Sequence, residues 1–244
     1  MRDYEIETKK RIDFIRDAVK TANVDGIVFA NSGGKDCALV GILCKMACDN
    51  TVGIILPCAS KRNYEMDKTD AEKVAEQFKI ATRQIDLTNA RNELIRVIGS
   101  EVQLKDAAII NIAPRLRMIT LYATAASENR LVAGTGNRSE GYMGYFTKWG
   151  DGAYDFNPIA DLTVTEVYEF LRYLKAPEFI FNKPPSAGLF DGQTDEDEMG
   201  VTYRSIDEYI LTGKANERDK AVIDKYHKAS GHKRVMPLVF PAQV

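Results

Sequence analysis

The sequence predicts an α/β protein: a doubly wound, mostly parallel sheet with helices on both faces, folded as a single domain over residues 1–244. Short apolar runs alternate along the chain with segments of helical periodicity, which is the pattern of a sheet covered on both faces. A composition of 45% hydrophobic and 28% charged residues excludes disordered, collagenous and coiled-coil proteins. The length of 244 residues also allows one sizeable core.

The first elements follow from the spacing of apolar residues. Apolar positions at helical spacing, with a charged outer face, predict a helix over 6–19. The apolar run 26–30 predicts a strand, residues 31–34 a tight glycine turn, and 35–48 a helix. The apolar run 51–57 predicts a second buried strand.

The middle of the chain continues this alternation. We expect a helix over 69–79, a short strand over 82–87 and helical character over 92–98. Pro114 suits the first turn of a helix, because the N–H that proline lacks would have no intrahelical partner there. The apolar run 131–134 predicts another buried strand.

The last third of the chain is less regular. Residues 163–174 form the last clearly periodic segment, and the C-terminal part has helical character. The acidic run 191–198 is expected to be a solvated, mobile loop rather than a metal site.

Charge and cysteine usage limit the partners. Lys and Arg number 33 against 35 Asp and Glu, and a net charge of −2 does not indicate binding to nucleic acid or to a membrane surface. The N-terminus is too charged for a signal peptide, and no apolar stretch reaches membrane-spanning length. Cys44 and Cys48 would share a helix face, but no second Cys or His pair completes a zinc site. We expect buried free thiols in a reduced, cytoplasmic protein.

The chemistry is expected at residues 32–37, S-G-G-K-D-C, because ligands of an open parallel sheet bind at the C-terminal ends of its strands. The two glycines let backbone N–H groups face an anion, and the following helix adds the positive end of its dipole. The spacing is neither that of a Walker A loop nor that of a dinucleotide-binding loop. Asp36 beside a polyphosphate would need a divalent cation, which makes it a candidate Mg²⁺ ligand. It fits equally well as a first-turn carboxylate favoured by the helix dipole.

This segment resembles the S-G-G-x-D-S signature of the N-type ATP pyrophosphatases, enzymes that adenylate a substrate and release pyrophosphate. Further segments narrow the resemblance to the ammonia-dependent NAD⁺ synthetases, of which F-T-K-x-G-D-G is the most specific. In order along nearly the whole chain, they are residues 115–119, 134–140, 146–152, 185–189, 200–203, 206–207 and 232–234. The resemblance implies the adenine nucleotide alpha hydrolase-like form of the predicted fold.

The resemblance implies a ligase of NAD biosynthesis whose substrates are ATP, deamido-NAD⁺ (nicotinic acid adenine dinucleotide) and ammonia. The substrate carboxylate would attack the α-phosphorus of ATP to give an NAD-adenylate and pyrophosphate. Ammonia would then displace AMP and yield NAD⁺. Positioning and electrostatics would provide most of the rate, with Mg²⁺ as cofactor. A homodimer with the dinucleotide site near the subunit interface is also implied.

The resemblance assigns roles to individual residues. Asp36 and Glu140 would be the catalytic carboxylates and the Mg²⁺ ligands. The ATP contacts would be Ala30, Asn31, Ser32, Gly33, Gly34, Lys35, Asp36, Cys37, Thr135 and Ser186. The deamido-NAD⁺ contacts would be Arg115, Lys148, Asp155, His232 and Lys233. Each of these last five also has a structural alternative as a solvated loop or surface residue.

Three positions depart from the family pattern. Cys37 replaces the usual Ser, Ser186 replaces the usual Thr, and Val164 stands where many members have a Lys that contacts ATP. Loss of that cation should weaken ATP binding unless another charge replaces it. Lys35 is the nearest candidate, although a lysine in the first turn of a helix can equally point to solvent.

Two other functions fit the glycine loop less well. A tRNA-modifying ATP pyrophosphatase would share S-G-G-K-D, but such enzymes usually carry a basic RNA-binding domain or metal-binding cysteines. A non-catalytic nucleotide-binding module would not need both Asp36 and Glu140. Glutamine-dependent relatives carry an additional glutaminase domain that does not fit into 244 residues, so free ammonia is the expected nitrogen source.

Overall fold

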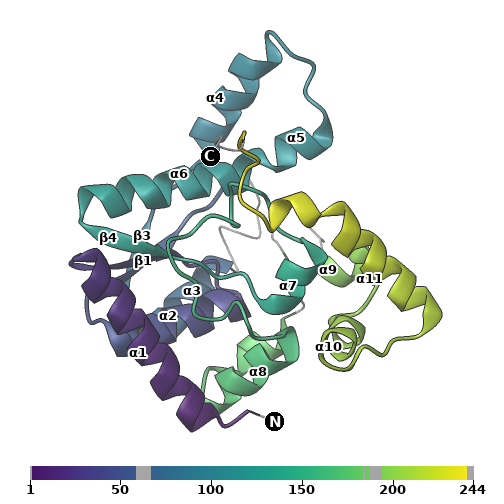
Figure 1. Cartoon of the computed structure of the whole chain (residues 1–244). Coiled ribbons are helices and arrows are strands. Elements are labelled where there is room, and N and C mark those ends of the chain that lie inside the picture. Colours follow the sequence, from purple (N-terminus) through teal and green to yellow (C-terminus); the bar gives the residue numbers. More distant parts are fainter. Residues whose placement is uncertain (1, 59–66, 184, 187–193, 241–244) are drawn as a thin grey trace.

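In the computed structural model, a four-stranded parallel sheet in the order β3-β2-β1-β4 carries helices on both faces (Figure 1). The predicted fold class is confirmed. The structure describes residues 2–58, 67–183, 185–186 and 194–240. The strands are β1 (Gly26–Ala30), β2 (Thr51–Ile55), β3 (Ala81–Gln84) and β4 (Arg130–Ala133). The helices are α1 (Tyr4–Ala22), α2 (Lys35–Ala47), α3 (Lys68–Phe78), α4 (Thr88–Gly99), α5 (Asp106–Ile110), α6 (Ile112–Ser127), α7 (Arg138–Met143), α8 (Val164–Tyr173), α9 (Asp195–Met199), α10 (Tyr203–Thr212) and α11 (Glu217–Ala229).

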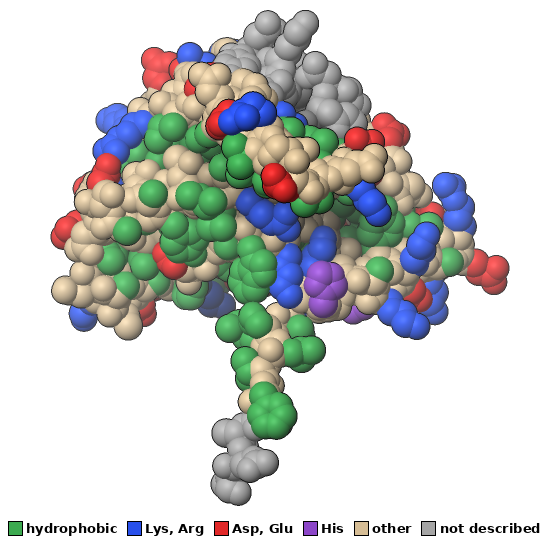
Figure 2. Space-filling view, turned by 90° about the horizontal axis from the view of Figure 1, so that it is seen from above, with side chains coloured by type: hydrophobic (Ala, Val, Ile, Leu, Met, Phe, Trp, Pro, Cys, Tyr) green, Lys and Arg blue, Asp and Glu red, His purple; other side chains and the backbone are tan. Residues whose placement is uncertain are grey.

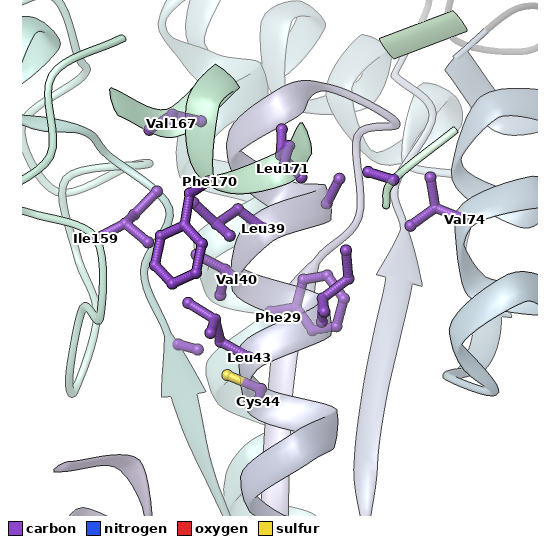
Figure 3. Close-up of a cluster of buried hydrophobic side chains, with 14 of the residues drawn as sticks. Phe29, Leu39, Val40, Leu43, Cys44, Val74, Ile159, Val167, Phe170 and Leu171 are labelled. Carbon is purple, nitrogen blue, oxygen red and sulfur yellow. The ribbon is translucent and has the colours of Figure 1, made fainter. Parts of the chain in front are cut away.

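Alternation along β1 divides the core between the two faces of the sheet. Ile27 and Phe29 pack with residues of α1, α2, α3 and α8, whereas Val28 packs with residues of α6. Figure 3 shows the first of these layers, with side chains of α2 lying between Phe29 and Phe170 of α8. Because both faces are covered, β1 and β2 appear in the sequence as continuous apolar runs.

Most predicted elements are present, some with shifted ends. β1 has the predicted bounds, the strand predicted over 51–57 ends at Ile55, and the strand predicted over 82–87 lies at Ala81–Gln84. β3 forms one edge of the sheet and is largely exposed, so its sequence lacks the apolar pattern of the other strands. Among the strands its bounds were therefore the least accurate.

Three short helices, α5, α7 and α9, have no counterpart in the prediction. Each has only five or six residues, too few for hydrophobic periodicity to be detected. α9 corrects the expectation of a solvated loop over 191–198: Asp195 is buried and accepts a hydrogen bond from the Tyr203 hydroxyl at 2.9 Å. Residues 191–193 of that run lie outside the described residues.

Besides the two layers on the sheet, a third, smaller apolar cluster joins α7, α8, α9, α10 and α11. The buried carboxylate of Asp207 in α10 connects three of these helices. It accepts hydrogen bonds from the Ser139 hydroxyl of α7, and from the backbone N–H and hydroxyl of Thr165 in α8 at 2.8 and 2.7 Å. Because Ser139 directly precedes Glu140, this network fixes the backbone from which the Glu140 side chain projects.

The cysteines agree with the prediction. All four are free thiols; Cys37, Cys44 and Cys58 are buried, and Cys48 is partly buried. Over the described part of the chain, every helix is too short or too polar to cross a bilayer.

Candidate active site

A cavity of about 590 Å³ opens at the C-terminal ends of β1, β2 and β4. An open parallel sheet is expected to bind its ligand at this edge. The lining of the cavity includes all the residues predicted to contact ATP: Ala30, Asn31, Ser32, Gly33, Gly34, Lys35, Asp36, Cys37, Thr135 and Ser186. Glu140 and Lys233 also line it. The fold therefore brings the glycine loop together with α7 and with residues near the C-terminus.

The turn between β1 and α2 has a backbone suited to an anion. Gly33 has a φ of +70°, and a Cβ at this position would lie 2.3 Å from the carbonyl oxygen of Asp67, so another residue would be strained and would clash. The buried Asn31 side chain holds the turn, accepting from the Gly33 N–H at 3.4 Å and donating to the carbonyl of Ala71 at 3.3 Å. The turn leads directly into the N-terminus of α2, where backbone N–H groups and the helix dipole favour an anion.

Three charged side chains meet beside this turn. The ammonium of Lys35 lies 2.8 Å from Asp36 Oδ2 and 3.9 Å from Glu140 Oε1. Asn137 connects the two carboxylates: its side-chain amide donates to Asp36 Oδ1, and its backbone N–H donates to Glu140 Oε2, both at 3.1 Å. Two carboxylates distant in the sequence thus share one wall of the cavity.

Burial and charge determine the ionisation of this group. Burial, followed by the nearby charge of Asp36, raises the pKa of Glu140 well above its usual range, and Lys35 opposes this shift. Burial by itself would lower the pKa of Lys35, but Asp36 and Glu140 outweigh it and raise the pKa, so the ammonium stays charged. The part of this shift that comes from Asp36 reflects repulsion between two nearby carboxylates, which a cation between them would relieve.

Asn137 contacts both carboxylates but is not among the site residues predicted from the sequence. As the N-cap of α7, Asn137 forms a capping box with Glu140. The Asn137 side chain accepts from the Glu140 N–H at 3.0 Å, and the Glu140 carboxylate accepts from the backbone N–H of Asn137. The signal is present in the sequence as Asn-x-x-Glu over 137–140, but it precedes a helix of only six residues. The cap holds one Glu140 oxygen and directs the other toward Lys35.

The Cys37 side chain is buried within the glycine loop. The Ser32 hydroxyl donates to its sulfur at 3.1 Å. Burial raises the pKa of the Cys37 thiol, and hydrogen bonds with Ser32 and Thr135 oppose this shift. The change from Ser to Cys therefore places a neutral thiol beside the loop and leaves its backbone N–H groups unchanged.

Four of the five residues expected to contact deamido-NAD⁺ lie side by side and are called the basic rim below: Arg115, Lys148, His232 and Lys233. The Arg115 guanidinium donates to the carbonyl of Lys148 at 3.3 Å, and the Lys148 ammonium donates to the carbonyl of His232 at 2.7 Å. His232 and Lys233 lie in the turn η3 (Gly231–Lys233), and Lys233 donates to two carbonyl oxygens after α7 at 2.8 and 2.7 Å. Figure 2 shows Lys, Arg and His side chains gathered beside a hollow in the surface.

Asp155, the fifth of these residues, makes structural hydrogen bonds. Its carboxylate accepts from the Val132 N–H at 2.7 Å and from the Tyr122 hydroxyl at 3.2 Å. It is exposed and does not belong to the cavity lining. In this conformation, Asp155 anchors the segment that follows the F-T-K-x-G-D-G motif to β4.

Val164, the first residue of α8, is 3% exposed and lies in the smaller apolar cluster with Met143 and Tyr203. Its backbone N–H donates to the Ser139 hydroxyl at 3.2 Å. A lysine at this position would have to pass these apolar side chains to reach the cavity. Lys35, in contrast, is buried against the site, so the alternative that it points to solvent is wrong.

The glycine loop and two carboxylates line one cavity, and Lys233 connects the basic rim to its wall. Preorganised dipoles and cations of this kind stabilise the charge that develops when a nucleotidyl group is transferred between anionic substrates. The arrangement therefore suits a reaction in which a nucleoside triphosphate activates a second anionic molecule.

Known proteins resemble this chain in sequence and in fold. The sequence model of the family described as NAD synthase matches residues 7–240. The NH(3)-dependent NAD(+) synthetase of Carboxydothermus hydrogenoformans is 44% identical over 240 residues, covering 97% of this chain and 98% of that protein. Among solved structures, NMN synthetase from Francisella tularensis superposes with a TM-score of 0.92 at 36% identity, covering 98% of this chain and 99% of that one. The NH3-dependent NAD synthetase from Campylobacter jejuni, in complex with the nitrate ion, superposes with a TM-score of 0.79 at 30% identity. This match covers 99% of this chain and 100% of that one.

The range matched by the family model, residues 7–240, spans the glycine loop and both carboxylates of the cavity. The agreement of sequence and fold over nearly the whole chain therefore means that the chain belongs to the NAD synthase family.

Proposed function

We propose that the chain is an ATP-dependent ligase that amidates deamido-NAD⁺ with ammonia to give NAD⁺, AMP and pyrophosphate, working as a single NAD⁺ synthetase domain over residues 1–244. The observation that carries this proposal is the meeting of the glycine loop with Asp36 and Glu140 in one cavity. Membership of the NAD synthase family supports the same reaction. The four free cysteines support a reducing compartment, the cytoplasm.

In the first step, an oxygen of the substrate carboxylate bonds to the α-phosphorus of ATP, and the bond from that phosphorus to the leaving pyrophosphate breaks. The glycine loop would hold the phosphates, with Thr135 and Ser186 at the cavity wall. The α2 dipole and the Lys35 ammonium would offset the charge that collects on pyrophosphate. In the second step, ammonia bonds to the acyl carbon, AMP leaves with the electron pair of the broken C–O bond, and the nitrogen releases a proton.

Mg²⁺ fits the residues that face the cavity. Asp36 and Glu140 provide carboxylate oxygens that line the same cavity and lie close to one ammonium, that of Lys35. Within the described ranges no group of three His, Cys, Asp or Glu side chains could hold a metal ion. That suits Mg²⁺, which is usually bound by one or two carboxylates together with substrate phosphates and water. When bound, it would offset the charge of the triphosphate.

Deamido-NAD⁺ is proposed to bind at the basic rim, where cationic side chains would face its phosphates, with Asp155 as a further contact.

We also propose a homodimer. Residues 235–240, which follow the rim, include five apolar side chains that are strongly exposed, up to 99% at Leu238. Figure 2 shows the coloured part of the C-terminal segment, with its green apolar side chains, standing away from the body of the molecule. Exposed apolar surface of this kind is typical of a contact between subunits.

The purified protein is expected to form NAD⁺ and AMP from ATP, Mg²⁺, deamido-NAD⁺ and ammonium, and to form neither with glutamine as the only nitrogen source. Both products can be quantified by liquid chromatography. A reaction without deamido-NAD⁺ controls for simple ATP hydrolysis. Absence of NAD⁺ with ammonium would contradict the proposed function, whereas efficient synthesis from glutamine would contradict only the nitrogen source.

A second candidate is the same amidation on nicotinic acid mononucleotide, which would yield NMN. It is favoured by the TM-score of 0.92 to an NMN synthetase, compared with 0.79 to an NH3-dependent NAD synthetase. Both acids present the same carboxylate on the same ring, and they differ only in the adenylate half. The ratio of kcat/KM for the two acids, measured with saturating ATP and ammonium, decides between them. A higher kcat/KM for deamido-NAD⁺ than for nicotinic acid mononucleotide supports the amidation of deamido-NAD⁺.

A further inference from the structure

Lys35 places a buried cation between the proposed Mg²⁺ ligands. Its side chain is 7% exposed, and its ammonium lies 2.8 Å from Asp36 Oδ2 and 3.9 Å from Glu140 Oε1. The centre of the Tyr203 ring is 5.5 Å away on another side. A buried charge persists only where it is paired, and the two groups that pair with Lys35 are the carboxylates proposed to hold the metal.

We propose that Lys35 is an exchangeable internal counter-cation of the Asp36–Glu140 pair. It pairs with these carboxylates while no nucleotide is bound, and it turns to the ATP phosphates when Mg²⁺ takes its place. This inference rests on the proposed function. Lys35 is the first residue of α2 and directly follows Gly34 of the phosphate loop, so its backbone lies at the helix end where an anion would bind.

Electrostatics makes the two cations compete. An ammonium and a divalent ion that approach the same carboxylates repel one another at these distances, and the repulsion is strong where water is largely excluded. The displaced ammonium then has the triphosphate, the most negative group of the complex, beside it. Lys35 thereby supplies the cation that is lost at Val164, whose side chain is enclosed in the smaller apolar cluster.

The test measures metal binding and nucleotide binding separately and without turnover. Lys35→Met keeps the apolar stem and removes the charge. Without nucleotide, this variant is expected to bind Mn²⁺ about ten-fold more tightly than the wild type, measured from the paramagnetic resonance of the free ion. It is expected to bind a non-hydrolysable Mg-ATP analogue about ten-fold more weakly, measured by calorimetry. If the role of Lys35 were purely structural, the substitution would weaken the binding of both Mn²⁺ and the Mg-ATP analogue, or of neither.

Lys45→Met is the matched control, because Lys45 lies near the other end of α2, pairs with Asp49 and does not belong to the cavity lining. Both of its affinities should equal those of the wild type. Adding Glu140→Gln to Lys35→Met should remove the gain in Mn²⁺ affinity and so locate it at the carboxylate pair. Lys35→Gln, which keeps a hydrogen-bond donor toward Asp36, provides the same comparison if the Met variant does not fold.

The outcomes separate this inference from the proposed function. If the wild type makes NAD⁺ and a folded Lys35 variant binds Mn²⁺ no more tightly than the wild type, the inference is wrong and the function stands. If the wild type makes no NAD⁺ but the variant shows tighter Mn²⁺ and weaker nucleotide binding, the proposed function fails and the counter-cation role stands.

Discussion

Asp36→Asn is expected to lower kcat/KM for ATP by at least about 100-fold while the protein stays folded. Changing a residue that only supports a metal ligand costs about 10–100-fold in affinity or activity, so removing the charge of a ligand should cost more. The amide keeps the volume of the carboxylate in the first turn of α2, and its oxygen can still accept the 3.1 Å hydrogen bond from Asn137. Steady-state kinetics and a thermal melting curve separate the two effects.

Asp49→Asn provides the control, because Asp49 is fully exposed just beyond the same helix and lies outside the cavity lining. This control should retain normal kinetics. Glu140→Gln should repeat the loss caused by Asp36→Asn, since the two carboxylates face the same ammonium. Near-normal turnover of Asp36→Asn at saturating Mg²⁺ would contradict its role as a metal ligand.

Phe170→Ala is expected to lower the free energy of unfolding by about 3–5 kcal/mol, the range found for truncating a buried aromatic side chain. Phe170 is fully buried in the first layer (Figure 3). Its ring centre lies 4.9 Å from that of Tyr4, and the Arg11 guanidinium lies 5.9 Å from the Phe170 ring centre. The cavity left behind would separate α8 from both α1 and α2. For a chain of this size, the melting temperature should fall by roughly 6–20 °C.

Phe14→Ala is the matched substitution for this comparison, because Phe14 is 48% exposed on α1. It should lower the melting temperature far less than Phe170→Ala. Since Phe170 does not line the cavity, kcat at 25 °C should remain near normal in the folded fraction of Phe170→Ala. A loss of stability no larger than that of Phe14→Ala would contradict the central place of Phe170 in the core.

The fold could be predicted wherever burial acts on a long or continuous segment. β1 is covered on both faces and α2 is buried along most of its length, so their apolar patterns mark them in the sequence. Helices with few residues were not predictable in this way: the helix of six residues that carries Glu140 has no detectable periodicity and depends on neighbours that are distant in the chain. The exposed edge strand β3 was predicted, but with an end three residues too late.

The candidate site also has parts that could be predicted from the sequence and parts that could not. The glycine loop can be recognised locally, because two adjacent glycines stand directly between an apolar run and a segment of helical periodicity. The resemblance names Glu140 as a partner of Asp36, but it does not reveal that Asn137 bridges them. That bridge requires the loop after β4 to meet the start of α2, which is a consequence of the sheet order.

By itself, therefore, the sequence determined the type of fold, the phosphate loop and the family resemblance that points to the reaction. These features are carried by hydrophobic periodicity, by glycine geometry and by collinear motifs, and all of them can be recognised one segment at a time. Only the tertiary structure decided which charges meet. It buried Val164 in an apolar cluster and placed the Lys35 ammonium between two carboxylates. The physical reason is that burial and electrostatic pairing depend on distances in space, which residue spacing along the chain does not contain.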